Sequence, residues 1–359
     1  MKKISVISVI FVLFALVMPI CVSGISANGW NPEDVNINIT IELTPDAHRN
    51  ITIHAEIPMT FSSEGFDVLN NASVQLDILS PAPGQLQVTG SCSVTFNQPV
   101  DSSTENILSQ IAMAYLMSPS MLDSMLQQFL ENYIATTQDT YSVPVAFQLE
   151  NVSITSFSWQ NPTLSASANI TIQSEIFENQ QLRDELPISI SGNLNISATE
   201  IRLRIEGSNA NANGWIELNA ANNTLTIDAF LSLPSEVIGE LVNPNVGLDL
   251  PLGNLENTLA NLENMFEGVH ITTTLIVPDG SNIENLQAGY TQDGNSYTWS
   301  GENAMKAIAD VITGQPLANV SYKYVPPSSY TLLIVAALLA IIVPIAIAGI
   351  ILWRRRCRR

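Results

Sequence analysis

The sequence predicts an α+β fold dominated by strands, an antiparallel sheet or sandwich with helices inserted between two strand-rich halves. It also predicts one transmembrane helix near the C-terminal end. Three observations support this class. Apolar and polar residues alternate over 35–96 and again over 143–231, as in half-buried strands. Between them, 103–135 has a helical period instead. Near the end, 331–353 carries no charge and is almost entirely aliphatic.

The N-terminal end has the features of a secretory signal. Lys2 and Lys3 precede an apolar run over 6–20, and small residues follow at Ser23, Gly24, Ser26 and Ala27. A basic start, a short apolar core and small residues are typical of a cleaved signal peptide, which we place at 1–27. The alternative is a signal anchor that is not cleaved.

The first strands form a predicted hairpin. Residues 35–43 and 51–57 alternate in polarity on either side of a turn at Pro45-Asp46. Further strands are expected near 74–78 and 86–96. Cys92 lies on the apolar face of the last strand. Cys21 lies in the signal and Cys357 in the tail, so Cys92 is the one cysteine of the external part and cannot form a disulfide there. We expect a buried, inert thiol.

A helical insertion is predicted at about 103–137, with a break at Ser118-Pro119-Ser120 because Pro favours the first turn of a helix. Methionines recur there every four residues, at Met113, Met117, Met121 and Met125. Met adapts to irregular apolar surroundings. Two interpretations follow, packing of the helices across the sheet or a lid over an apolar ligand.

Strands resume at about Val143, and residues 220–223 are expected to connect a hairpin. An amphipathic helix is predicted over 252–266. We therefore assign 28–267 to the main ectodomain. A smaller membrane-proximal β module follows at 268–325, with a hairpin at Asp293-Gly294-Asn295, a helix at 302–312 and a last strand at 320–324.

The predicted span, Thr331 to Trp353, follows a spacer at 326–330. Its 23 residues would reach roughly 34 Å as a helix, enough to cross a bilayer. The tail 354–359 holds five arginines, which favours a cytoplasmic C-terminus and an external N-terminal part. The lipid bilayer is therefore the first expected partner, and the cell membrane the expected location.

Charge excludes one class of partner. Of the 13 Lys and Arg residues, two lie in the signal and five in the tail, so six remain against all 33 acidic residues. Without a basic patch to neutralise phosphates, nucleic-acid binding is excluded.

Eight N-x-S/T sequons are spread over the external part, and none has Pro at its middle position. On a strand, the asparagine and the residue two positions later share a face, so we expect glycans on the polar side of the sheet. The alternative is that polar faces rich in Asn, Ser and Thr produce such triplets by chance. The asparagines are Asn38, Asn50, Asn71, Asn151, Asn169, Asn195, Asn222 and Asn319.

Signals for catalysis are few. His54 and Glu56 share a polar strand face, but two ligands on one strand make only part of a metal site. His48 and His270 have no paired ligand nearby, and no nucleophile elbow, zinc-protease or phosphate-loop motif occurs. We therefore expect no catalytic residue, cofactor or metal. An enzyme built on His54 and Glu56 is the remaining alternative.

The overall plan resembles single-pass cell-surface proteins of archaea. The likeness rests on the signal, the sequon-rich and cysteine-poor β ectodomain, the C-terminal span and the basic end, and on no specific motif. It implies a structural, adhesive or partner-binding role among other envelope proteins. The alternative is an envelope protein that binds a lipid or another apolar ligand.

Overall fold

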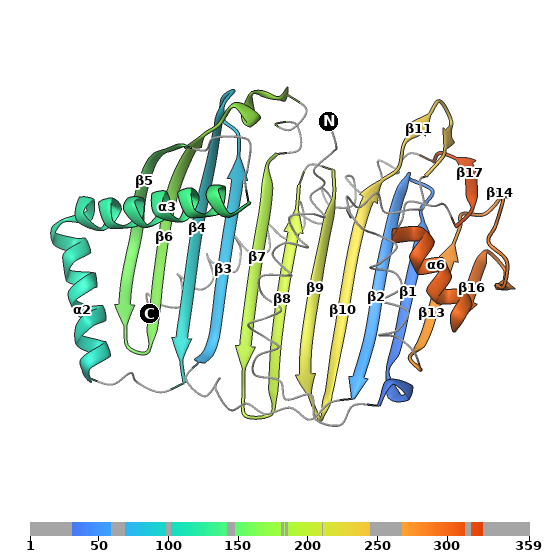
Figure 1. Cartoon of the computed structure of the whole chain (residues 1–359), viewed down its shortest axis with the longest axis horizontal. Coiled ribbons are helices and arrows are strands. Elements are labelled where there is room, and N and C mark those ends of the chain that lie inside the picture. Colours follow the sequence, from blue (N-terminus) through green and yellow to red (C-terminus); the bar gives the residue numbers. More distant parts are fainter. Residues whose placement is uncertain are drawn as a thin grey trace, which may run out of the picture.

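The computed structural model describes residues 31–58, 69–97, 102–141, 148–180, 183, 186–209, 211–244, 268–312 and 317–325. Over these residues the fold is β-dominated, as predicted, with one 13-stranded sheet and a second, four-stranded one (Figure 1). The predicted signal at 1–27 and the predicted span at 331–353 lie outside them. No helix within the described ranges is both long and apolar enough to cross a membrane.

The strands of the large sheet are β1 (Asn36–Leu43), β2 (His48–Pro58), β3 (Leu69–Leu79), β4 (Gln85–Phe96), β5 (Gln148–Gln160), β6 (Thr163–Gln173), β7 (Ile188–Ile196), β8 (Glu200–Ser208), β9 (Asn213–Ala221), β10 (Thr224–Pro234), β13 (His270–Ile276), β15 (Thr291–Asp293) and β16 (Ser296–Ser300). The small sheet contains β11 (Val237–Ile238), β12 (Leu241–Val242), β14 (Asn282–Glu284) and β17 (Asn319–Lys323).

The strand order of the large sheet is β15-β16-β13-β1-β2-β10-β9-β8-β7-β3-β4-β6-β5. Every neighbouring pair is antiparallel except β1 and β13, which run parallel. The sheet is therefore mixed and not purely antiparallel as expected. A tight turn can join only antiparallel neighbours, whereas β13 is distant in sequence from β1 and can approach it in either direction.

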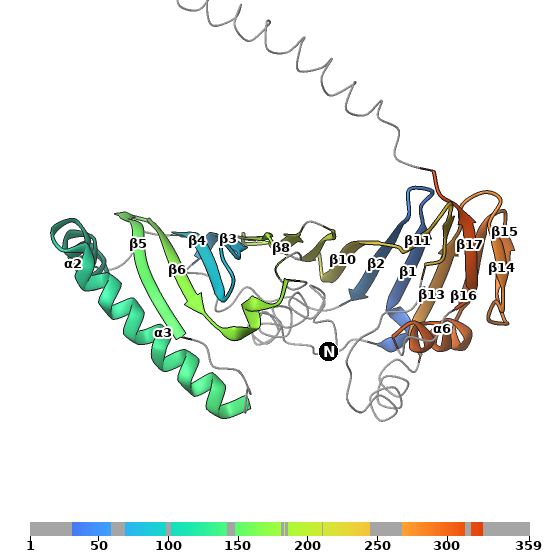
Figure 2. The same ribbon diagram turned by 90° about the horizontal axis from the view of Figure 1, so that it is seen from above.

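Two helices lie between the strand-rich halves, α2 (Ser102–Met117) and α3 (Pro119–Tyr141). The break falls at Ser118 and Pro119 opens the second helix, as predicted. A third helix, α6 (Glu302–Ile312), follows β16. Short 3-10 turns lie at η1 (Pro32–Asp34) and η2 (Glu175–Glu178). The large sheet is curved, and α3 and α6 lie at its opposite ends on the same side (Figure 2).

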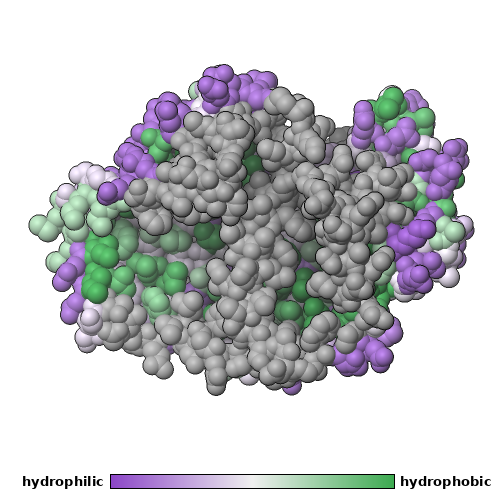
Figure 3. Space-filling model, viewed as in Figure 1, coloured by the Kyte–Doolittle hydropathy of each residue, from purple (hydrophilic) through white to green (hydrophobic). Residues whose placement is uncertain are grey.

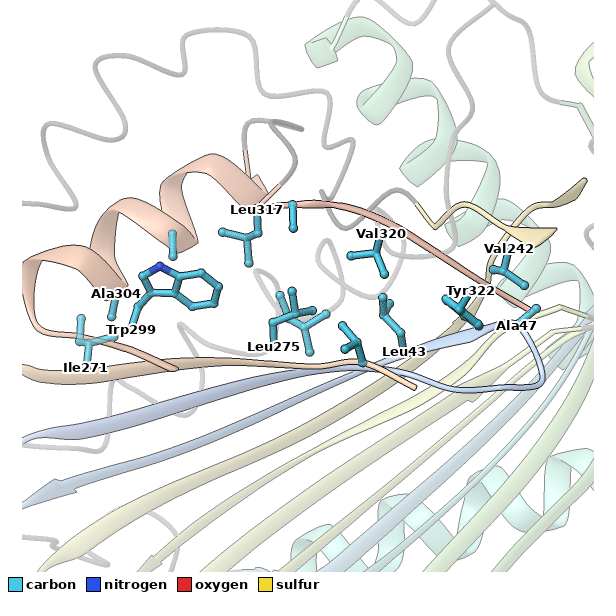
Figure 4. Close-up of a cluster of buried hydrophobic side chains, with 14 residues drawn as sticks. Leu43, Ala47, Val242, Ile271, Leu275, Trp299, Ala304, Leu317, Val320 and Tyr322 are labelled. Carbon is cyan, nitrogen blue, oxygen red and sulfur yellow. The ribbon is translucent and has the colours of Figure 1, made fainter. Parts of the chain in front are cut away.

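The best-buried cluster lies at one end of the large sheet, under α6 and the small sheet (Figure 4). Trp299 and Leu275 point from the large sheet toward Leu317 and Val320. The residues of 268–325 do not build this core alone, because Leu43 of β1 and Ala47 of the following turn belong to it. The elements predicted in 268–325 are confirmed, and β13, β15 and β16 extend the large sheet.

Three predicted hairpins are confirmed, β1–β2, β9–β10 and β15–β16. Asn222 and Asn223 both have positive φ at the β9–β10 turn, the backbone that two-residue hairpin turns require. Gly294 fills the same role between β15 and β16. The helix predicted over 252–266 lies outside the described residues.

Candidate functional site

The large sheet separates apolar from polar side chains over most of its width. Residues paired across neighbouring strands lie on the same face of a sheet. The pairings from β1 across to β5 therefore show which side chains share each face. The apolar positions Ile39, Ile53 and Ala229 are paired in series across three strands. Leu194 and Ala72 pair in the same way further along. The sequence prediction of one apolar and one polar face is therefore confirmed by the register.

Six of the eight sequon asparagines lie on the polar face of this sheet, one each on β1, β2, β3, β5, β6 and β7. The other two lie in the β9–β10 turn and at the first residue of β17. The asparagines exposed to solvent are Asn38, Asn151, Asn195, Asn222 and Asn319, and those partly buried are Asn50, Asn71 and Asn169. For the six asparagines of the large sheet, glycans would therefore lie on a single face, opposite the apolar one.

The polar face of the outer strands is lined mainly by hydroxyl groups. Ser93 and Ser165 approach to 3.0 Å across β4 and β6, and Thr95 and Thr163 approach to 3.2 Å. An open pocket of about 460 Å³ lies over this region. These hydroxyl groups already form hydrogen bonds with one another. They are also uncharged, so the pocket presents no charged group to a ligand.

An ion-pair network lies at the centre of the polar face. Glu217 bridges Arg202 and Arg204 at 2.8 and 3.0 Å. The hydrogen bond from Arg202, and to a smaller extent that from Arg204, lowers the pKa of Glu217. The Arg204 guanidinium also lies 4.4 Å from the ring centroid of Trp215, within cation–π range. Both arginines are thus paired with carboxylates, which argues against an anion-binding role.

His54 has a partner that the sequence did not reveal. The pairing of β2 with β10 places Asp228 opposite His54, and Asp228 Oδ1 lies 2.7 Å from His54 Nδ1. Glu56 Oε1 lies 3.6 Å from the other ring nitrogen. The hydrogen bond to Asp228, above all, raises the pKa of His54. Only strand order could show this contact, because 174 residues separate the two positions.

The carboxylates around His54 do not amount to a metal centre. Within the part of the chain that the structure describes, no group of three or more His, Cys, Asp or Glu side chains is arranged to hold a metal ion. The arrangement is that of a partly exposed imidazole held by one short ion pair. His48 begins β2 beside the Asp46 carbonyl, and His270 begins β13.

Cys92 is exposed, which corrects the expectation that it is buried. Its strand face is the predicted apolar one, where it pairs with Val74 and Ala166. Val74 is itself 42% exposed. Alternation along a strand predicts the face on which a side chain lies, but it does not predict what covers that face. The middle of the apolar face therefore carries accessible apolar groups.

The methionines of the helices do not face the sheet. Met113, Met117, Met121 and Met125 are 56–85% exposed. The helices contact the edge strand β5, but these four side chains do not supply the packing that was expected between the helices and the sheet. The inward helix surface instead uses Tyr115, whose ring contacts Phe157 of β5. Figure 3 shows apolar surface over the corner where α2 meets α3. Their role as a lid for an apolar ligand stays a prediction.

Comparisons with known proteins add little to this geometry. No protein-family model and no curated protein matches the chain. Among solved structures, the chain is similar to the M1 zinc metallopeptidase from Deinococcus radiodurans, with 7% sequence identity and a TM-score of 0.17. That comparison covers 83% of this chain and 43% of the peptidase chain, so the chain spans less than half of its length. A likeness at this TM-score supports no argument about fold or activity.

Proposed function

We propose that this chain is a non-catalytic, N-glycosylated protein of the cell surface, held in the membrane by a C-terminal helix over 331–353. Its N-terminal part lies outside the cell and the tail 354–359 lies in the cytoplasm. The observation that carries this proposal is the location of six sequon asparagines on one polar face. Glycans on that face would leave the opposite face free for contacts with other envelope components.

The charge distribution supports the same proposal. The external part is strongly acidic, while the tail is basic. An acidic surface keeps a large sheet soluble and discourages association with other copies. The arrangement of His54 with two carboxylates gives no reason to assign a catalytic step, and the proposed role is structural, adhesive or partner-binding.

The test is peptide mass spectrometry of the protein purified from its own host. The exposed sequon asparagines Asn38, Asn151 and Asn195 should carry glycans, because an enzyme can reach them on the folded sheet. Asn193, exposed on β7 but outside any sequon, is the internal control and should be unmodified. Unmodified peptides at all eight sequons would contradict the glycoprotein proposal.

A second function is favoured by a separate observation, the exposed Val74 and Cys92 in the middle of the apolar face. A lipid or another apolar ligand could lie there, because apolar groups gain free energy on leaving water. Apart from Arg49, the paired positions on this face from β2 to β5 carry no charged side chain.

Organic extraction of the purified chain, followed by mass spectrometry, tests this second function. Val74→Asp places a charge on the apolar face and should abolish the extracted ligand. Gln75→Asp places the same charge one residue away on the polar face and should leave it unchanged. Extracts free of any apolar compound in the unmodified protein would remove this candidate.

A further inference from the structure

A second group of exposed apolar side chains lies far from the α2–α3 corner, on the small sheet. Ile238 and Leu241 of the β11–β12 hairpin are 60% and 50% exposed, and Val325, just after β17, is 55% exposed. Figure 3 shows apolar surface at the upper right, where Figure 1 places this hairpin. Exposed aliphatic side chains that gather in this way mark interaction surfaces.

The register explains why these side chains face outward. Ile238 pairs with Leu241, and Leu241 pairs with Lys323 of β17, so the three share the outer face of the small sheet. Val242 and Tyr322 form the next pair and are 0% and 2% exposed on the inner face. The inner face of the small sheet thus packs on the buried core, whereas Ile238 and Leu241 on the outer face do not contribute to that core.

This outer face lies where the chain leaves the described domain. The amide of Tyr324 donates to the Glu240 carbonyl at 2.7 Å, and the amide of Val325 donates to the Pro45 carbonyl at 2.9 Å. These bonds hold Val325 beside the β11–β12 turn. Only the five residues 326–330 then separate Val325 from the proposed span. Five extended residues reach at most about 18 Å, so the hairpin is tethered close to the bilayer surface.

The chemistry of the hairpin fits a lipid interface. Ile238 and Leu241 present aliphatic groups at its tip, and Gly239 with φ +65° makes the turn between them. Lys323 is 77% exposed on the same face, and its ammonium lies 4.0 Å from the exposed carboxylate of Glu240. A lysine stem can lie along apolar surface while its charged end stays in water. Glu236 and Glu240 add two acidic groups nearby, so a lipid surface without net charge suits the hairpin better than an anionic one.

We propose that the β11–β12 hairpin, with Lys323 and Val325, inserts its outer face into the interface of the membrane that holds the chain. This proposal rests on the membrane anchor proposed above. The hairpin would be a second membrane contact besides the span. Two contacts would fix the orientation of the large sheet relative to the bilayer, whereas the span alone would leave that orientation free.

The experiment uses the full chain in phosphatidylcholine vesicles. Cys21→Ser, Cys92→Ser and Cys357→Ser remove the three native thiols. A fluorescent label sensitive to its surroundings is then attached at Ile238→Cys or, independently, at Leu241→Cys. Thr199→Cys, exposed in the β7–β8 turn, is the matched control. The β7–β8 turn lies at the opposite end of the strands, about 35 Å away along β10.

Labels at 238 and 241 should shift their emission to the blue and lose intensity when the lipids carry a quencher near the headgroup. The label at 199 should do neither. Vesicle flotation is measured on the same samples. A chain that floats while the labels at 238 and 241 behave as in water would overturn the hairpin contact and leave the anchor intact.

Two other outcomes are equally decisive. Labels that are shielded from water but insensitive to the lipid quencher would indicate contact with protein, and would overturn the proposal. A chain that does not float with the vesicles would remove the membrane anchor itself, and with it this inference.

Discussion

At the residue scale, strand pairing determines the pH range over which the His54 side chain is charged. His54 lies beside Glu56 in sequence, but its shorter contact is with Asp228 on the neighbouring strand. The hydrogen bond to Asp228 is the main reason why the pKa of His54 is raised. The folded pKa thus lies above the value near 6.5 of an unfolded chain. The stabilisation by His54 is therefore fully present below that unfolded value and is lost as the pH rises through the folded pKa.

We expect Asp228→Asn to lower the pKa of His54, measured by NMR titration of the ring protons. The loss of stability at acidic pH should stay below about 1 kcal/mol, because the pair is partly exposed and screened by solvent. The chemical shift of His48, compared between the two proteins at one fixed pH, is the control and should be the same in both. If the pKa of His54 were unchanged in this variant, the contact with Asp228 would not determine its charge.

At the element scale, the two inserted helices protect an edge of the large sheet. The N–H of Ile154 on β5 donates to Asp123 of α3 at 2.6 Å, and the Tyr115 hydroxyl of α2 donates to the Thr155 carbonyl at 2.9 Å. β5 is the last strand in the order of the sheet, and the free groups of an edge strand invite pairing with another chain. Side chains from α2 and α3 occupy two of these groups.

Asp123→Ala should therefore destabilise the fold by about 2 kcal/mol, the scale of a lost hydrogen bond to a charged group. It should also increase self-association, as measured by sedimentation velocity over a concentration series. Glu131→Ala removes an exposed acid of the same helix that accepts a hydrogen bond from Gln127, and should change neither property. Equal association of the two variants would show that Asp123 does not protect the edge.

At the scale of the whole molecule, the chain does not divide where its sequence pattern changes. Residues 268–325 supply α6 and two of the four strands of the small sheet, but their core includes Ile41 and Leu43 of β1. The parallel pairing of β1 with β13 joins the two parts along seven residue pairs. We infer that the C-terminal elements depend on β1 for their stability.

Leu43→Ala should cost about 3 kcal/mol through the cavity that it leaves in this core. Hydrogen exchange should show the largest loss of protection in α6 and β16. Ile190→Ala on β7, also at a buried position, is the control and should affect β7 and β8 more than α6. Unchanged protection of α6 in Leu43→Ala would instead favour an independent membrane-proximal module.

The sequence by itself determined most strands of the large sheet, the broken helical pair, the hairpin turns and the two faces of the sheet. These features depend on local backbone preferences and on side-chain alternation, which are written in consecutive residues. The same pattern also predicted the polar face for the six sequon asparagines in the large sheet, because Asn and the Ser or Thr two positions later follow the same period. The sequence did not predict the short strands β11, β12 and β14 of the small sheet.

The tertiary structure alone decided the strand order, and with it every contact between distant segments. The Asp228 partner of His54, the parallel β1–β13 pair and the shared core around Trp299 all follow from that order. It also decided exposure, since alternation cannot say whether an apolar face is covered. That is why Cys92, which was expected to be buried, is exposed, and why the four methionines do not pack against the sheet. Strand order and side-chain exposure depend on contacts between segments that are far apart in the chain, so they cannot be predicted from any one stretch of sequence.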